Sequence, residues 1–261
     1  GLLVLHDFYL GHLLAWQDRH AEPGAWGRAL YASHGYHAVV QRQVDTQGAM
    51  YDFPSSFPLV AGSRGVVVHS QHARVLASRW YGDEVAGGWS VVPLLYQGGP
   101  VEDSASAKAA LGFKVGDFVV CSFGFLGETK LSERLMRCWL ASSLARDRSC
   151  HLVFVGDGGD GPYGRRIDHW VRTEGKGARV AVTGFVSAEV YRRYLSAADM
   201  AVQLRAMSRG ESSATVLDCM GQGRAVVVNA NGAMAELDPE AVWMISDHFD
   251  DAELVRALDT L

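Results

Sequence analysis

The sequence lacks three features that would place it in other classes of protein: a long apolar run, a close cysteine pair and an excess of positive charge. No apolar run reaches about 18 residues, which argues against a membrane-spanning helix. The formal net charge is -5, whereas a nucleic-acid binder needs a basic surface to neutralise phosphates. We therefore expect neither a spanning segment nor a nucleic-acid partner.

The four cysteines, Cys121, Cys138, Cys150 and Cys219, contain no Cys-x-x-Cys spacing, which leaves no signal for a dithiol redox site. Cys121 and Cys219 lie in apolar or helical patterns, so we interpret them as buried, reduced thiols. Reduced thiols are typical of a reducing compartment, and we expect a cytoplasmic protein.

Short Val-rich runs alternate with amphipathic segments along the 261 residues, of which 48% are hydrophobic and 20% are charged. The apolar residues in these runs are continuous rather than alternating, which is typical of strands buried on both faces of a parallel sheet. We predict strands at Leu2–Leu5, Gly65–His69, Ser90–Pro93, Phe118–Phe123, His151–Val155, Arg179–Thr183, Met200–Leu204, Ala225–Asn229 and Val242–Ile245.

The segments between these strands have helical periodicity. Leu131, Leu135, Met136, Trp139 and Leu140, for example, fall on one helical face. Strands that alternate with helices form βαβ units with right-handed crossovers. The sequence therefore predicts an α/β fold built from two Rossmann-like lobes.

The segment from Leu94 to Ala107 interrupts the alternation and is interpreted as a linker, with a domain boundary near Tyr96. The C-terminal part then has about six strands, enough for a full doubly wound sheet. The N-terminal part supplies only about three strands, which leaves an open sheet edge. We therefore expect an incomplete N-terminal lobe and a natural chain that begins before Gly1.

One polar loop, Ser208–Ser213, follows a predicted strand and leads into a helix predicted over Ala214–Gln222, with Gly223 at its end. A helix start offers unpaired N–H groups and a positive dipole, and small residues let a phosphate approach them. Asp218 lies about two turns after Glu211, so both carboxylates could face sugar hydroxyls. The residues alone fit a capped helix with no ligand equally well.

A second loop, within Ser122–Leu135, carries Gly124, Gly127 and Lys130 between a strand and a helix. Glycines at a strand end permit close approach of a ligand to the backbone. A lysine in the first helical turn opposes the helix dipole unless an anion binds nearby. The alternative is a solvated lysine, and the spacing is not the dinucleotide pattern G-x-G-x-x-G.

His6 and Asp7 directly follow the first predicted strand. Ligands of parallel α/β sheets lie at the carboxyl ends of strands, where a histidine could donate to a sugar hydroxyl. A structural histidine is the alternative. The spacings His34/His37 and His69/His72 lack further metal ligands, and we interpret these residues as helix-surface histidines.

The chain resembles the GT-B retaining glycosyltransferases of family 4 (glycosyl transferases group 1), of the bacterial glycan-assembly type. The resemblance runs over nearly the whole chain and is densest from Phe118 to Leu237. It is carried by the segments "LVFVGDG", "VAVTGFVSAEVYRRYLSAADMAVQL", "GESSATVLDCMGQGRAVVVNANGAMAEL", "LHDFYLGHL" and "VVVHSQHARVL". It implies that residues 1–95 are the second half of an acceptor-side domain and residues 96–261 a nucleotide-sugar-binding domain.

The resemblance also implies roles for the loop within Ser122–Leu135 and for a turn further along the chain. The family's G-R-x-x-x-x-K-G segment matches Gly124 to Leu131, with Lys130 at the phosphate-binding lysine and Phe125 in place of the arginine. Gly184, Phe185 and Val186 match the turn that faces the base. We hypothesise that Arg209, or else Arg205, supplies the charge of the missing arginine.

In the helix after the loop Ser208–Ser213, Asp218 matches the acid that binds the ribose. The family's first acid would align with Gly210 in that loop, and Glu211 stands one residue later. The backbone from Gly210 through Ser212 to Ser213 would meet the diphosphate and the sugar. His6 matches the histidine near the transferred sugar. The resemblance thus implies His6, Lys130 and Glu211 as catalytic residues.

The expected reaction moves a sugar from a UDP- or GDP-sugar, bound as substrate, to a hydroxyl of a glycan or lipid-linked glycan acceptor. We expect no cofactor and no metal, because no Asp-x-Asp lies near the phosphate site. The alternatives are a nucleotide-sugar 2-epimerase and a non-catalytic nucleotide-sugar- or glycan-binding subunit. Peripheral contact with the inner face of the cytoplasmic membrane is left open.

Overall fold

The computed structural model describes residues 1–96 and 98–261, and its chain divides into two compact units. Unit 1 contains Gly1–Leu94 and the short segment Ser208–Ser212, and unit 2 contains Leu95–Met207 and Ser213–Leu261. The sequence predicted one cut near Tyr96. The structure differs in the place of Ser208–Ser212, which belongs to unit 1 although it lies far along the chain.

Unit 1 contains a parallel three-stranded sheet in the order β1-β2-β3. Its strands are β1 (Leu2–Leu5), β2 (Gly65–Val68) and β3 (Ser90–Val91), and the helices after β2 are α6 (Gln71–Tyr81) and α7 (Asp83–Ala86). Phe8, Val68 and Trp89 are among the buried residues that pack between the strands and these helices. The three predicted strands are confirmed, although β2 and β3 end earlier than expected.

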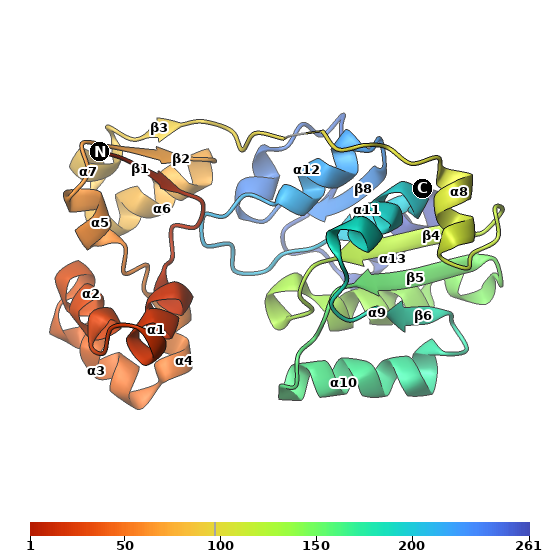
Figure 1. Ribbon diagram of the computed structural model, residues 1–261, viewed down its shortest axis with the longest axis horizontal. Helices are drawn as coiled ribbons and strands as arrows, with labels where there is room; N and C mark the ends of the chain where they lie inside the picture. The colour runs from red at the N-terminus through yellow and green to blue at the C-terminus, as the bar shows by residue number, and fades with distance from the viewer. Residues whose placement is uncertain (97) are drawn as a thin grey trace. The chain divides into compact units, whose positions relative to one another are not determined.

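Five short helices separate β1 from β2: α1 (Gly11–His20), α2 (Ala25–His34), α3 (Tyr36–Val44), α4 (Thr46–Asp52) and α5 (Phe57–Ala61). Helices α1 to α4 form a cluster away from the strands (Figure 1) and have their own core around Trp26 and Leu30. A Cβ on Gly11 would lie 2.5 Å from the carbonyl oxygen of Met50, so glycine permits α1 to cross close to α4.

Unit 2 contains a parallel six-stranded sheet in the order β6-β5-β4-β7-β8-β9. Its strands are β4 (Phe118–Phe123), β5 (Cys150–Val155), β6 (Val180–Val182), β7 (Met200–Gln203), β8 (Ala225–Asn229) and β9 (Trp243–Ile245). Most side chains of β4, β5, β7 and β8 are buried, as the continuous apolar runs predicted for a sheet covered on both faces. The six predicted strands are confirmed, with small shifts at their ends.

Helices cover both faces of this sheet (Figure 1). Buried residues of α9 (Ser132–Ala141), α10 (Pro162–Trp170) and α13 (Asp251–Thr260) share one core cluster. Buried residues of α11 (Ala188–Ala197) and α12 (Ala214–Gly221) share the other, and α8 (Ser104–Ala110) packs against α11. Short helical turns complete the unit: η1 (Glu128–Lys130), η2 (Leu144–Arg146), η3 (Val171–Gly175) and η4 (Gly232–Glu236).

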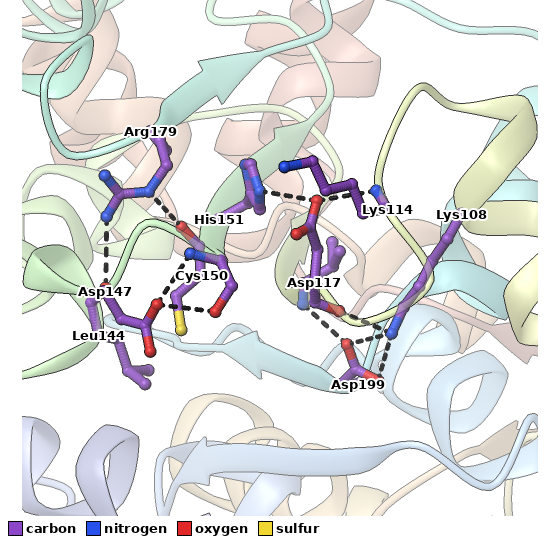
Figure 2. A network of polar contacts seen from close by, with 11 residues as sticks. Lys108, Lys114, Asp117, Leu144, Asp147, Cys150, His151, Arg179 and Asp199 are labelled. Carbon is purple, nitrogen blue, oxygen red and sulfur yellow. Dashed lines mark hydrogen bonds and ion pairs between the residues drawn. The ribbon is translucent and has the colours of Figure 1, made fainter.

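A network of polar contacts links the residues at the amino ends of the unit 2 strands, and Figure 2 shows it from close by. The Lys108 ammonium is nearly buried and donates to the carbonyl oxygen of Asp117 and to the Asp199 carboxylate, each at 2.8 Å. Asp199 also accepts from the backbone N–H of Val119 at 2.8 Å. Arg179 donates to the carbonyl oxygen of Cys150 at 2.7 Å. These contacts occupy the edge opposite the carboxyl ends of the strands.

All four cysteines are buried and unpaired, which confirms the interpretation of buried thiols. Burial raises the pKa of Cys219 to about 12 and that of Cys138 to about 11, so neither thiol is poised as a nucleophile. Among the described residues, none of the helices is both long and apolar enough to cross a membrane.

Candidate functional site

The strand order of unit 2 defines a topological switch point between β4 and β7. From β4 the chain adds β5 and β6 on one side, and it then returns to add β7, β8 and β9 on the other. Ligands of open α/β sheets bind at such a point, outside the carboxyl ends of the strands. The loops that follow β4 and β7 are therefore the first candidates for a binding site.

The loop after β4 folds back so that Lys130 lies against the strand end. Its ammonium donates to the carbonyl oxygen of Phe123 at 3.3 Å, and a Cβ on Gly124 would lie 2.3 Å from Nζ. Gly124 has a φ of +98°, a conformation that favours glycine. Gly124 and Lys130, which the sequence placed in one loop, thus lie against each other.

The local structure around Lys130 differs from the expected first helical turn. Lys130 ends the 3₁₀ turn η1, and Leu131, with a φ of +52°, separates that turn from helix α9. The predicted placement of Lys130 inside the first turn of a helix is therefore wrong. The prediction that Lys130 opposes the dipole of that helix no longer supports a bound anion. The ammonium instead donates to the backbone carbonyl oxygen of Phe123.

The loop after β7 lies beside the loop after β4. The backbone N–H of Ala206 donates to the carbonyl oxygen of Thr129 at 2.8 Å. The Arg205 guanidinium donates to the carbonyl oxygen of Leu204 at 3.0 Å and contacts Ser213 Oγ at 3.4 Å. Arg205 and Lys130 thus both belong to the loops at the switch point, and together they bring positive charge there.

Helix α12 starts at the end of this second loop. Ser213 is its N-cap, and its Oγ accepts from the backbone N–H of Val216 at 3.4 Å. The predicted helix is confirmed with an earlier end at Gly221, and Gly223 has the expected positive φ. The helix start therefore adds its dipole to the two cations of the adjoining loops.

Asp218, on α12, accepts a hydrogen bond from the Tyr191 hydroxyl at 2.9 Å. Burial raises the pKa of Tyr191, and the neighbouring Asp218 carboxylate raises it further, so the phenol stays a donor. Sequence reasoning did not single out Tyr191 and missed this contact. The hydroxyl holds the carboxylate in one orientation at the helix surface.

Two phenylalanine rings are exposed on the loops after β4 and β6. Phe185 is 92% exposed and Phe125 is 62% exposed, although both are large apolar side chains. Gly184, before Phe185, has a φ of +70°, and Val186, after it, packs against the core. Both rings offer a flat apolar surface to a planar ligand group.

The loops after β4, β5 and β6 touch through backbone groups. The backbone N–H of Leu126 donates to the carbonyl oxygen of Asp157 at 2.9 Å. The backbone N–H of Gly156 donates to Thr183 Oγ1 at 3.1 Å. A Cβ on Gly156 would lie 2.1 Å from the Gly124 carbonyl oxygen, so only glycine permits this approach. The three loops form one connected rim in unit 2.

A second group of predicted residues lies in unit 1, where Ser208–Ser212 packs on the ends of β1 and β2. A Cβ on Gly210 would lie 2.9 Å from Cβ of Phe8, and Gly210 has a φ of +93°. Ser212 Oγ donates to the carbonyl oxygen of His69 at 3.5 Å. His6 directly follows β1 and is exposed.

Arg209, Glu211 and Asp7 form a charged cluster in unit 1. The backbone N–H of Arg209 donates to Glu211 Oε2 at 2.7 Å, and its guanidinium lies 4.9 Å from the centre of the Tyr51 ring. Its Nη1 is buried and has no hydrogen-bond partner among the described residues. Desolvation raises the pKa of Asp7, the Glu211 charge raises it further, and Arg209 partly offsets both.

The predicted site residues therefore form two groups. Unit 2 contains Gly124, Lys130, Gly184, Phe185, Val186, Ser213 and Asp218, and unit 1 contains His6, Arg209, Gly210, Glu211 and Ser212. Of the two arginines considered for the missing charge, Arg205 shares unit 2 with Lys130, whereas Arg209 does not. Within residues 1–96 and 98–261, no three His, Cys, Asp or Glu side chains gather as a metal site requires.

Sequence reasoning missed His69. It was interpreted as a helix-surface residue, which is wrong, because it follows β2 and precedes α6. Its ring lies next to His6, with Nε2 3.0 Å from His6 Nδ1. The signal that could have found it is its place at the carboxyl end of a predicted strand, which is close to the signal that singled out His6.

A sequence profile described as "Glycosyl transferases group 1" matches residues 117–261. Among solved structures, HepE from Anabaena, in complex with UDP and glucose, is 17% identical over 99% of this chain and 61% of its own, with a TM-score of 0.67. WaaG, a glycosyltransferase involved in lipopolysaccharide biosynthesis, is 13% identical over 98% and 64%, with a TM-score of 0.69.

Sucrose-phosphate synthase from Thermosynechococcus elongatus is 21% identical over 95% of this chain and 68% of its own, with a TM-score of 0.61. At these identities the likeness shows a shared fold. The chain spans less than two thirds of the length of HepE and of WaaG. No curated protein sequence matches the chain significantly.

Proposed function

The chain belongs to the group 1 glycosyltransferase family and has the GT-B fold, and from this premise we propose that it transfers a sugar from a nucleoside diphosphate sugar to an acceptor hydroxyl. The observation that carries the proposal is Lys130, held against Gly124 at the switch point of unit 2. A fixed ammonium there can stabilise the charge that grows on a leaving diphosphate.

Two further groups in unit 2 support a diphosphate at this point. Arg205 contacts Ser213, and the N-terminus of α12 begins at the same residue. A cation and a helix start both favour an anion, and neither needs to reorganise as the leaving group departs. We assign to Arg205 the charge that the family's arginine supplies, because Phe125 stands at that arginine's position.

The nucleoside part of the donor would use the rim of unit 2. Phe185 and Phe125 offer exposed aromatic faces, and Gly184 leaves the approach to Phe185 open. Asp218, oriented by Tyr191, offers carboxylate oxygens to the ribose hydroxyls. HepE binds UDP and glucose, which supports a UDP-sugar as donor, and a GDP-sugar is the alternative.

We assign contacts with the transferred sugar to the unit 1 residues His6 and Glu211. The transition state is oxocarbenium-like at the sugar, and retention of configuration fits deprotonation of the acceptor by the leaving phosphate. The proposed reaction needs no metal and no cofactor beyond the nucleotide-sugar substrate. WaaG is involved in lipopolysaccharide biosynthesis, which supports a glycan or lipid-linked glycan as acceptor.

Thermal unfolding with UDP and with GDP tests the proposal. One nucleotide should raise the melting temperature, since a ligand at about 100 times its Kd adds about 2.7 kcal/mol to the free energy of unfolding. Lys130→Ala should reduce that shift. Lys114→Ala is the matched control, because Lys114 is exposed near the opposite edge of the sheet. No shift with either nucleotide would contradict the proposal.

Phe125 favours one second candidate, a subunit that binds a nucleotide-sugar without turnover. Loss of the family's arginine removes a donor that would stabilise the leaving group more than the bound substrate. Incubation with radiolabelled UDP-glucose and an acceptor glycan separates the two candidates. Transfer or hydrolysis excludes the binding subunit, whereas a melting shift without either reaction favours it.

A further inference from the structure

The residues that follow the three strands of unit 1 form a hydrogen-bonded chain across the carboxyl edge of its sheet. The parallel strands are paired in register to their last residues, so His6 after β1, His69 after β2 and Val92 after β3 are neighbours. His69 Nε2 lies 3.0 Å from His6 Nδ1. His69 Nδ1 lies 2.8 Å from the carbonyl oxygen of Val92.

This chain fixes the positions of the protons when both rings are neutral. A carbonyl oxygen only accepts, so Nδ1 of His69 carries a proton and donates it to Val92. A neutral imidazole has one N–H, so Nε2 of His69 is an acceptor. The facing Nδ1 of His6 must then be the donor, which leaves Nε2 of His6 without a proton.

We propose that His69 is a positioning residue that holds neutral His6 in its Nδ1–H tautomer, so that His6 presents the lone pair of Nε2 as an acceptor. The tautomer follows from the contacts within unit 1. The identity of the ligand rests on the proposed function: a hydroxyl of the transferred sugar, which can donate to Nε2. A histidine in the opposite tautomer would present a donor and would favour a carbonyl or carboxylate oxygen instead.

The surroundings of the pair hold it in place. His6 is exposed and can meet a ligand, whereas His69 is partly buried. Ser212 donates to the carbonyl oxygen of His69 from the segment packed on the strand ends. The two rings lie with their centroids 4.8 Å apart, and the Asp7 carboxylate interacts electrostatically with His6, Arg209 and Glu211. The pair is therefore anchored at His69 and open at His6.

Long-range ¹H–¹⁵N correlation spectra of the ¹⁵N-labelled 261-residue chain measure the tautomer directly. The spectra are recorded at about pH 8.5, where histidine side chains are neutral. We expect Nδ1 of His6 at the shift of a protonated nitrogen and Nε2 at that of an unprotonated nitrogen. A wild-type His6 in the Nε2–H form overturns the proposal.

Two variants separate positioning from mere packing. His69→Phe keeps a ring but removes the acceptor, so His6 should shift towards the Nε2–H tautomer. His69→Gln places an amide oxygen near the position of Nε2, so His6 should keep its Nδ1–H tautomer. The tautomer of His151, whose Nε2 lies 3.2 Å from Asp117 in unit 2, should not change and serves as internal control. An unchanged His6 tautomer in His69→Phe overturns the role of His69.

Transfer kinetics separate this inference from the proposed function. His69→Phe should lower kcat/KM by about two- to tenfold, the effect of losing one ordinary hydrogen bond, and His69→Gln should restore it. A chain that shows the expected tautomers but neither binds a nucleotide nor transfers a sugar supports the inference and contradicts the proposed function. Equal kcat/KM in His69→Phe and wild type would contradict the proposal that the tautomer set by His69 assists sugar transfer, whichever tautomer the spectra show.

Discussion

His34 illustrates how burial sets the charge of a single side chain. Its ring packs against Phe53 and Trp80, with centroids 5.1 Å and 4.9 Å away. Its Nε2 accepts from the backbone N–H of Ser55 at 3.2 Å, which requires an unprotonated nitrogen. Desolvation lowers the pKa of His34 to about 4. The folded protein therefore keeps this ring neutral at pH values where an exposed histidine is charged.

We expect this histidine to destabilise the protein in acid. Because the pKa of His34 is lowered in the folded state, the unfolded chain binds one more proton than the folded chain between about pH 6.5 and pH 4. The free energy of unfolding should fall by about 2 kcal/mol over this window, allowing for partial exposure of the ring. The loss should be absent above the window and complete below it.

Urea unfolding at about pH 7 and pH 4.5 measures the effect. His34→Gln, which can still accept from Ser55, should lose less stability between the two pH values than wild type. His37→Gln is the matched control, because His37 is exposed and lies only three residues after His34. If His34→Gln and wild type lost the same amount, the burial argument would be wrong.

Lys130 is the residue on which the proposed chemistry depends most. Lys130→Ala should remove about 2–3 kcal/mol of transition-state stabilisation, the usual size for one charge-stabilising donor. In transfer assays kcat should fall about 30- to 150-fold, because the charge grows as the diphosphate leaves. Lys114→Ala should transfer at the wild-type rate. Unchanged turnover in Lys130→Ala would remove the lysine from the mechanism.

Single residues could be predicted from the sequence where strand ends marked them. His6 and Gly124 were singled out in this way, because parallel strands bring their carboxyl ends to one edge. Lys130 was singled out by its place before a predicted helix, and the roles of all three stay predictions. His69 stands at a strand end too, but its H-x-x-H spacing drew attention to metal ligation and a helix surface. The αL conformation of Leu131, which sets Lys130 outside helix α9, leaves no mark in the sequence because leucine rarely adopts it.

At the scale of elements, the predicted strands were found because their Val-rich runs are buried on both faces. The sequence predicted helical character between β1 and β2, but not its division into the five helices α1 to α5. Their apolar residues are divided between a small core and the surface, where Trp16, Tyr31 and Val44 are exposed. Such short helices owe their stability to packing against one another, and a periodicity argument has little to detect in them.

The contact between helix α10 and the loop after β5 leads to a prediction about glycine. A Cβ on Gly164 would lie 2.1 Å from the carbonyl oxygen of Gly159, which is backbone and cannot rotate away. Gly164→Ala should therefore lower the free energy of unfolding by about 1–3 kcal/mol through overpacking. Chemical denaturation at neutral pH measures the loss.

Gly161→Ala is the control for this prediction. Gly161 caps the same helix, has a φ of -71°, and a Cβ there would meet no atom within 4 Å. Its unfolding free energy should stay within about 0.5 kcal/mol of wild type. Equal unfolding free energies for Gly164→Ala and Gly161→Ala would contradict the role of the close backbone approach.

At the scale of the whole molecule, each unit has its own sheet and its own buried clusters. The separate lobes could be predicted from the interruption after Leu94. The membership of Ser208–Ser212 in unit 1 could not, because it depends on contacts such as Gly210 with Phe8, about 200 residues apart in the chain. Local patterns carry no information about such pairs.

This division predicts where a nucleotide protects the backbone. Hydrogen exchange in the presence of the nucleotide that raises the melting temperature should slow in residues 124–130 and 184–186 of unit 2. Exchange in helices α1 to α4 should remain at its free rate, because the proposed nucleoside and phosphate contacts lie in unit 2. Equal slowing in α1 to α4 would contradict the placement of the nucleotide.

The detour of Ser208–Ser212 matters for anyone who recombines this chain with its relatives. The backbone leaves unit 2 after Met207, contributes five residues to unit 1 and returns at Ser213. A chimera joined only near Leu94 would pack the corresponding segment of the other parent against Phe8 and Ala73. There is no room for a side chain at the position of Gly210. A functional chimera must therefore take both pieces of unit 1, Gly1–Leu94 and Ser208–Ser212, from the same parent.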